Sequence, residues 1–178
     1  MASKEQKTMI PVRMNIESME RRGDMMPVSD SILFLEGQLE TKGTGYILTY
    51  DEEVTDDGLS DRTKVTLHLS KDRVMMRREG TFSTMMAFDR HRPYEGMYET
   101  PYGSMQIHVQ TRDVTSTLSN SAGLVHLEYE MSISGGDSIY RILNIRYISM
   151  DSIQNICQDM PFSMKLKDSD ALPWDVEP

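Results

Sequence analysis

The sequence is short of cysteine, of long apolar runs and of positive charge. Cys157 is the single cysteine among 178 residues, so the chain cannot form an intramolecular disulfide. No apolar run approaches the roughly 20 residues that span a bilayer, and residues 1–7 lack the apolar core of a signal peptide. The 28 acidic residues outnumber the 19 basic ones, and the net charge of −9 disfavours nucleic-acid binding. We therefore expect a cytoplasmic protein with no membrane insertion and no nucleic-acid partner.

Helical periodicity is also missing from the first 150 residues. Polar and apolar side chains alternate with period two instead, most clearly in residues 63–70 and 124–133. About ten such segments are separated by turn signals such as Gly135-Gly136. Closure into a barrel removes the edges that so long a sheet would otherwise expose. The pattern therefore predicts an all-β fold with one closed antiparallel β-barrel of about eight to ten strands.

The same pattern divides the chain into three parts. Residues 1–9 read as a flexible N-terminal arm, and residues 10–150 contain the alternating segments of the barrel domain. Residues 151–178 form a C-terminal extension, with a short helix or an irregular tail, because prolines and acidic residues are frequent there. Within the barrel domain, Gly37 interrupts an apolar segment and is predicted to form a β-bulge.

Residues 94–103 combine three tyrosines, two glycines and a proline between two alternating segments. Pro101 restricts φ and offers no backbone donor, which suits the end of a strand. Gly96 and Gly103 allow a kink and a tight turn, and Gly103 is expected to need a positive φ. We predict that this stretch is the corner where the sheet bends to close, with Gly96, Thr100, Pro101 and Gly103 as its structural residues.

The run from Gly96 to Gly103, followed by an alternating segment, resembles the signature of the YwiB-like family of uncharacterised bacterial proteins. The resemblance extends over about residues 10–150 and includes Tyr46, Tyr50 and the segment 64–69. It implies a small lipocalin-like (calycin) β-barrel. It implies no activity, cofactor or catalytic residue, and it does not extend to the residues after 150.

Residue patterns of catalytic and metal sites are missing. There is no Gly-x-Ser-x-Gly motif around a nucleophile, and the glycine-rich turns are not followed by a helix that could receive a phosphate. His68, His108 and His126 lie on the polar faces of predicted strands, without the spacing of metal ligands. We therefore predict a protein that is not an enzyme and that needs no cofactor or metal.

Two arginines stand out because they share the apolar faces of predicted strands. Arg78 alternates with Val74 and Met76, and Arg141 alternates with Leu143 and other apolar residues. A buried guanidinium needs an anionic partner, since leaving it unpaired costs several kcal/mol. That partner is either the acid group of a ligand or a glutamate at the rim of the barrel. The 16 methionines either line an adaptable binding surface or fill an irregular core.

These observations lead to two hypotheses for the function. In the first, the barrel binds a small amphipathic or apolar ligand in its interior, and Arg78, Arg141, Tyr98 and Tyr102 contact that ligand. In the second, the protein's own side chains fill the barrel, which then acts as a non-enzymatic protein-interaction or scaffolding module. A small barrel is just wide enough for either arrangement.

Overall fold

The computed structural model describes residues 8–23, 29–56 and 59–159. Within these residues, almost every segment is a strand that hydrogen-bonds to a strand next to it in the sequence. The elements are β1 (Met9–Arg22), β2 (Ser29–Lys42), β3 (Gly45–Asp56), β4 (Leu59–Leu69), β5 (Val74–Glu79), β6 (Ser83–Phe88), β7 (Tyr94–Thr100), β8 (Gly103–Leu118), β9 (Ala122–Ile133), β10 (Ile139–Ser149) and α1 (Met150–Asp159).

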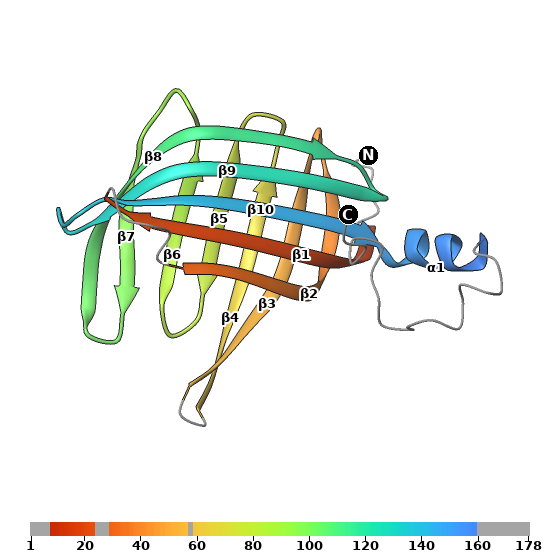
Figure 1. Cartoon of the computed structure of the whole chain (residues 1–178), viewed down its shortest axis with the longest axis horizontal. Helices are drawn as coiled ribbons and strands as arrows, with labels where there is room; N and C mark the ends of the chain where they lie inside the picture. Colours follow the sequence, from red (N-terminus) through yellow and green to blue (C-terminus); the bar gives the residue numbers. More distant parts are fainter. Residues whose placement is uncertain (1–7, 24–28, 57–58, 160–178) are drawn as a thin grey trace, which may run out of the picture.

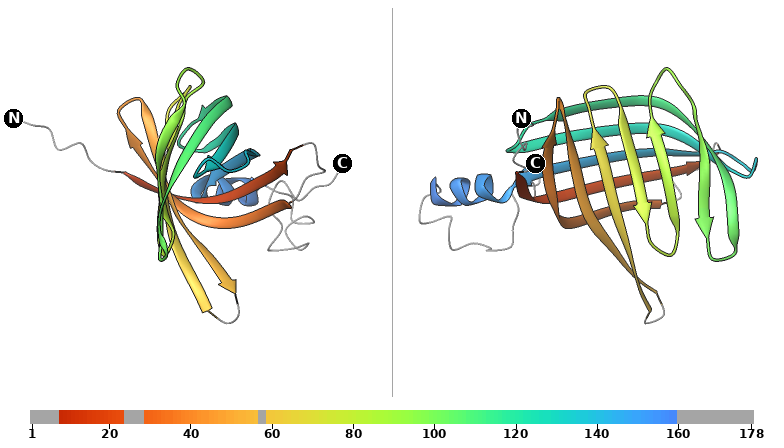
Figure 2. Two further views of the ribbon diagram at one scale, coloured as in Figure 1. Left: turned by 90° about the vertical axis from the view of Figure 1, so that its left-hand side faces the viewer. Right: turned by 180° about the vertical axis from the view of Figure 1, so that it is seen from behind.

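The strands form one closed antiparallel barrel (Figures 1 and 2). Closure depends on β1, which pairs with β2 on one side and with β10 on the other. The predicted all-β fold with a closed barrel is therefore confirmed. Helix α1 continues from β10 and extends away from one end of the barrel (Figure 1). Within the described ranges, no helix reaches the length and apolar character that a membrane crossing requires.

The end of the barrel next to α1 is filled by the protein's own side chains. Alternate residues of each strand point inward, and at this end they are apolar and fully buried: Val12, Met14, Leu39, Leu48, Val65, Leu67, Val74, Val125, Leu127, Ile145 and Tyr147. Burial of each large aliphatic side chain contributes about 1.5–3 kcal/mol. The Tyr147 hydroxyl donates a hydrogen bond to the Ser119 carbonyl at 2.8 Å, so this phenol is buried with a partner.

The Tyr-Gly-Pro stretch forms a hairpin and does not close the barrel. Strands β7 and β8 pair from Tyr94↔Val109 to Thr100↔Gly103, with Pro101 and Tyr102 as the loop. The Thr100 hydroxyl accepts a hydrogen bond from the Tyr102 N–H and donates one to the Gly103 carbonyl. Gly103 has a φ of +127°, as predicted. Gly96 lies inside β7, where the ring of Tyr94 occupies the space that a Cβ would need.

The ladder between β2 and β3 covers only part of each strand. Pairing runs from Lys42↔Gly45 to Gly37↔Tyr50 and then stops, while β1 and β2 stay paired to Ser29. Gly37 keeps a regular register with both neighbours, so the predicted bulge is wrong at this position. The glycine is needed because a Cβ there would come within 3 Å of the Met14 sulfur and the Thr49 carbonyl. A register shift occurs instead in β8, between Thr111 and Asp113.

Replacement of Gly103 tests the hairpin. A β-branched residue rarely adopts a positive φ, so Gly103→Val should lower the free energy of unfolding by about 1–3 kcal/mol. Pro101→Ala keeps an allowed backbone and should cost less than about 1 kcal/mol. Thermal or urea unfolding of the two variants checks the order. An unfolding curve for Gly103→Val that coincides with the wild type would contradict this account of the turn.

Candidate functional site

The end of the barrel away from α1 is hollow. A cavity of about 540 Å³ lies among the inward-facing side chains there, within the usual size range for small-molecule sites. Much of its wall is apolar and comes from strands on all sides of the barrel: Ile16, Leu33, Met76, Met86, Ile107, Met131, Ile133, Ile139 and Leu143. One end of the interior is thus filled by side chains, and the other end has room for a small ligand.

The charged residues of the cavity wall belong to a group of neighbouring arginine, glutamate and tyrosine side chains. Period-two alternation brings Arg78 inward after Val74 and Met76, and it brings Arg141 inward beside Leu143. Glu52 follows Tyr50 on the inner face of β3. Glu20 is inward on β1 by the same alternation and contacts Arg141 from the neighbouring strand.

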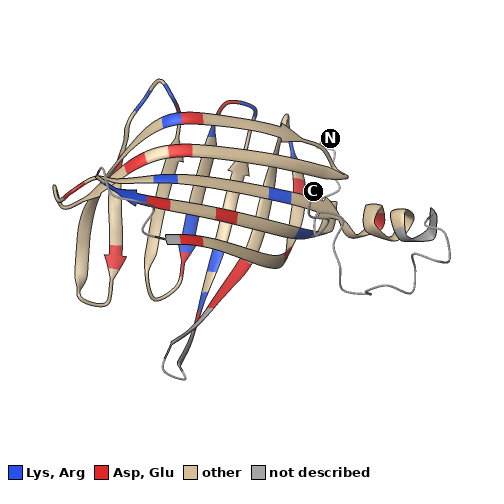
Figure 3. Cartoon of the chain, in the orientation of Figure 1, with Lys and Arg blue, Asp and Glu red and all other residues tan. Residues whose placement is uncertain are grey.

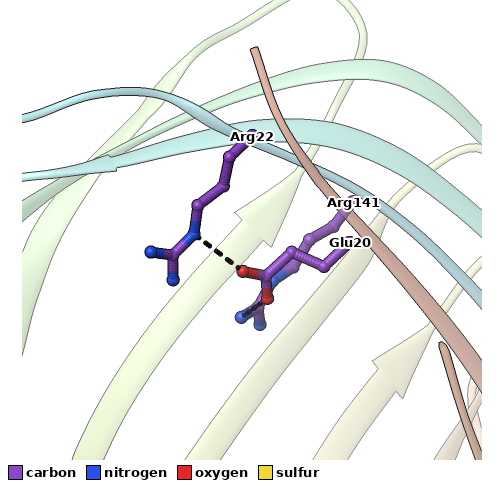
Figure 4. A network of polar contacts seen from close by, with 3 residues as sticks. All are labelled: Glu20, Arg22 and Arg141. Carbon is purple, nitrogen blue, oxygen red and sulfur yellow. Dashed lines mark hydrogen bonds and ion pairs between the residues drawn. The ribbon is translucent and has the colours of Figure 1, made fainter. Parts of the chain in front are cut away.

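Each of the two arginines that were predicted to point inward has a glutamate partner. Arg78 donates a hydrogen bond to Glu52, whose side chain is only 13% exposed. The Arg141 guanidinium donates from Nη2 to Oε2 of Glu20 at 2.6 Å. The other oxygen of Glu20 accepts from Nε of Arg22 at 3.3 Å, so one carboxylate lies between two guanidinium groups (Figure 4). The second alternative from the sequence, pairing with glutamates, is therefore realised for both arginines.

Among the described residues, three guanidinium groups, those of Arg22, Arg78 and Arg141, contact the two carboxylates of Glu20 and Glu52. This set of residues therefore has one more cation than anions, and the Arg22 side chain is 62% exposed. In addition, Nε of Arg141 is buried and has no hydrogen-bond partner among the described residues. A buried N–H without an acceptor costs about 1–3 kcal/mol. An acceptor that entered the cavity and reached this atom would supply the missing hydrogen bond.

Two buried phenols adjoin the network. Burial, and then the nearby negative charge of Glu52, raise the pKa of Tyr50 above its ordinary value. Burial also raises the pKa of Tyr129, although the positive charge of Arg141 opposes this shift. Burial alone would lower the pKa of Arg141, but interactions with Tyr129 and Glu20 raise it overall. At neutral pH the phenols are thus neutral hydrogen-bonding groups and the guanidinium is charged.

One part of the cavity wall contains two stacked aromatic rings and the shortest strand pairing among the described strands. Phe82, in the β5–β6 turn, stacks on Tyr98 of β7 with ring centroids 6.1 Å apart. Strands β6 and β7 pair only at Ser83↔Glu99 and Thr84↔Tyr98. The Thr84 hydroxyl adds a hydrogen bond between β6 and β7 by donating to the Met97 carbonyl at 3.2 Å. Tyr98 and Thr84 both line the cavity.

The structure brings three of the four predicted ligand-binding residues together. Arg78, Arg141 and Tyr98 all line the cavity. Tyr102 lies in the β7–β8 loop, is 94% exposed and is not part of the cavity wall. Sequence reasoning missed Glu20, Glu52 and Tyr129. The signal for Glu20 was its place in the alternation that begins at Val12, because every second residue from there points inward.

Comparison with known proteins identifies the family. The family described as "Domain of unknown function (DUF1934)" matches residues 14–145, which is most of the barrel. The chain belongs to this family. Among solved structures, this DUF1934 member is similar to the ywiB protein from Bacillus subtilis, with a TM-score of 0.69 and 19% sequence identity. The match covers 80% of this chain and 94% of that protein, and it shows a shared fold. No curated protein matches the sequence.

Removal of the central carboxylate tests the network. Glu20→Gln leaves the guanidinium groups of Arg22 and Arg141 without their shared anion, and should lower the free energy of unfolding by about 1–3 kcal/mol. Glu17→Gln is a matched control on the same strand, because Glu17 pairs with Arg146 on the outer surface. That exposed pair should contribute less than about 1 kcal/mol. Equal losses in urea denaturation of the two variants would contradict a special role for Glu20.

Proposed function

We propose that the protein is a non-enzymatic binding protein that holds one small amphipathic anion in the hollow end of its barrel. The acid group of the ligand accepts a hydrogen bond from Nε of Arg141, and its apolar part lies against the aliphatic and methionine side chains of the cavity. The observations that carry this proposal are a cavity of about 540 Å³ that Arg141 lines, and an Nε atom on that side chain that is buried without a hydrogen-bond partner among the described residues.

The charge balance supports an anion over a neutral or cationic ligand. Three guanidinium groups share the two carboxylates of Glu20 and Glu52, so a bound monoanion would balance the charges of these five residues. A charge-assisted hydrogen bond is about twice as strong as a neutral one, and more so where water is excluded. The side chain of Arg141 is about one-third exposed, so a ligand can reach it. Methionines at positions 76, 86 and 131 let the apolar wall adapt to the shape of a chain or ring.

Binding of ten-carbon chains with different head groups tests the proposal. Decanoate, decanol and decylamine differ only in the charge of the head, and each can be titrated against a fluorescent fatty-acid analogue bound to the protein. Decanoate should displace the analogue at least tenfold more effectively than decanol, because a charge-assisted bond contributes about 1.5–3 kcal/mol. Decylamine should be the weakest of the three, since the network already carries an excess positive charge.

Three variants give the comparison its control. Arg141→Met should weaken decanoate binding to the level of decanol, while Glu20→Gln should strengthen it, because one competing carboxylate is lost. Arg146→Met removes an arginine from the outer ion pair with Glu17 and should leave binding unchanged. Equal binding of all three chains, or equal binding by the wild type and Arg141→Met, would contradict the proposal.

A further inference from the structure

Among the described residues, the first half of β2 is paired along one backbone edge only. Residues 29–36 pair with β1, but the ladder to β3 stops at Gly37, and no other strand among the described residues pairs with their second side. The β3–β4 hairpin turns away from β2 beyond this point (Figures 1 and 2). We refer to residues 29–36 as the β2 edge. Its outward N–H and C=O groups are a template for a further strand.

The side chains of the β2 edge are unusually open and apolar. Ser31, Ile32, Leu33 and Phe34 are four consecutive exposed residues, with Ile32 at 61% and Phe34 at 53%. Proteins usually protect such an edge with a lysine, a proline or a bulge. The β2 edge contains no lysine and no proline, and its register with β1 is regular. It therefore keeps the features that favour pairing with another chain.

The charges on the outer face of the β2 edge indicate which kind of peptide segment could pair with it. Asp30, Ile32, Phe34 and Glu36 alternate on this face, so two apolar residues lie between two acids. The Glu36 side chain is 74% exposed, and its ion pair with Arg13 is long, at 3.6 Å. Strand β2 carries no basic residue before Lys42 (Figure 3).

We propose that the β2 edge binds an extended segment of another protein by strand addition, and that alternate positions of this segment are basic, apolar, apolar and basic. Backbone hydrogen bonds along the edge supply affinity. The apolar pair packs on Ile32 and Phe34, and the basic residues lie opposite Asp30 and Glu36, as favourable cross-strand pairs require. The side chains that make this interaction lie on the outer face of β2, whereas the ligand proposed for the cavity would contact the inner face.

A second copy of this chain fits the edge less well. Antiparallel pairing of two β2 edges about Leu33 would put Asp30 of each copy opposite Glu36 of the other. Like charges directly opposite each other are destabilising, and two molecules of net charge −9 repel at long range. A basic segment is instead attracted both by Asp30 and Glu36 on the edge and by the net negative charge of the protein.

Fluorescence anisotropy with the full chain and a labelled peptide tests this proposal. The peptide Lys-Thr-Val-Thr-Ile-Thr-Lys matches the expected alternation, and the same peptide with both lysines replaced by glutamate is its counterpart. The wild type should bind the basic peptide about tenfold more tightly than the acidic one, because two favourable charge pairs replace two unfavourable ones. The double variant Asp30→Lys, Glu36→Lys should reverse that preference.

A charge-matched variant and hydrogen exchange of the backbone amides distinguish strand addition from general electrostatic attraction. Glu95→Lys, Asp137→Lys makes the same change in net charge at exposed positions away from the β2 edge, and it should keep the wild-type preference. Hydrogen exchange should show new amide protection in residues 31–35 on addition of the basic peptide, and Ile32→Lys should abolish it.

Three results would overturn the proposal. The first is that neither peptide binds the wild type. The second is that the two double variants respond alike, which would indicate general electrostatic attraction. The third is that protection of residues 31–35 rises with protein concentration in the absence of peptide, which would assign the edge to a second copy.

Discussion

The number of strands around the barrel is the constraint on which the rest of the structure depends. Barrel diameter grows with strand number, and eight strands leave an interior just wide enough to be filled by side chains. This barrel has ten. Its inward residues close the end next to α1 with aliphatic side chains and Tyr147, but at the other end they leave about 540 Å³ open. A wider interior also makes room for guanidinium and carboxylate groups that a filled core would exclude.

The separation of β2 from β3 has two consequences for the same region of the molecule. The ladder between them ends at Gly37 and Tyr50, so the β2 edge has no second neighbouring strand in the part of the chain that the structure describes. Leu33 of that edge and Glu52 of β3 both line the cavity. The wall of the cavity and the free edge therefore share a strand, and we expect ligand binding inside and strand addition outside to influence each other.

Much of the fold could be predicted from the alternation of side chains, because period two is a local property. It correctly placed Arg78 and Arg141 on inward faces. The glycine and proline content of residues 94–103, which is also local, correctly predicted a positive φ at Gly103. Pairing and closure depend on residues far apart in the sequence. The hairpin at Pro101 was therefore mistaken for the closing corner, whereas closure depends on the pairing of β1 with β10.

The site was less predictable than the fold for the same reason. Glu20 and Arg141 are 121 residues apart, and only the β1–β10 register brings them into contact. Tyr102 lies in a tyrosine-rich stretch and was therefore a candidate for ligand binding. It belongs to a two-residue loop, however, and its side chain is exposed to solvent. The hollow end could not be inferred either, because it depends on the summed volume of inward side chains and not on any one of them.

The state of the Arg141 side chain provides the most direct test of the central claim that the cavity receives an anion at this atom. In ¹⁵N-labelled protein, the Nε–Hε signal of Arg141 can be identified by its loss in Arg141→Lys and followed during addition of decanoate. The account predicts a downfield shift that saturates at one decanoate per protein, while the signal of the outer Arg146 stays in place. An Arg141 signal that does not move, or that moves together with all other arginine signals, would contradict it.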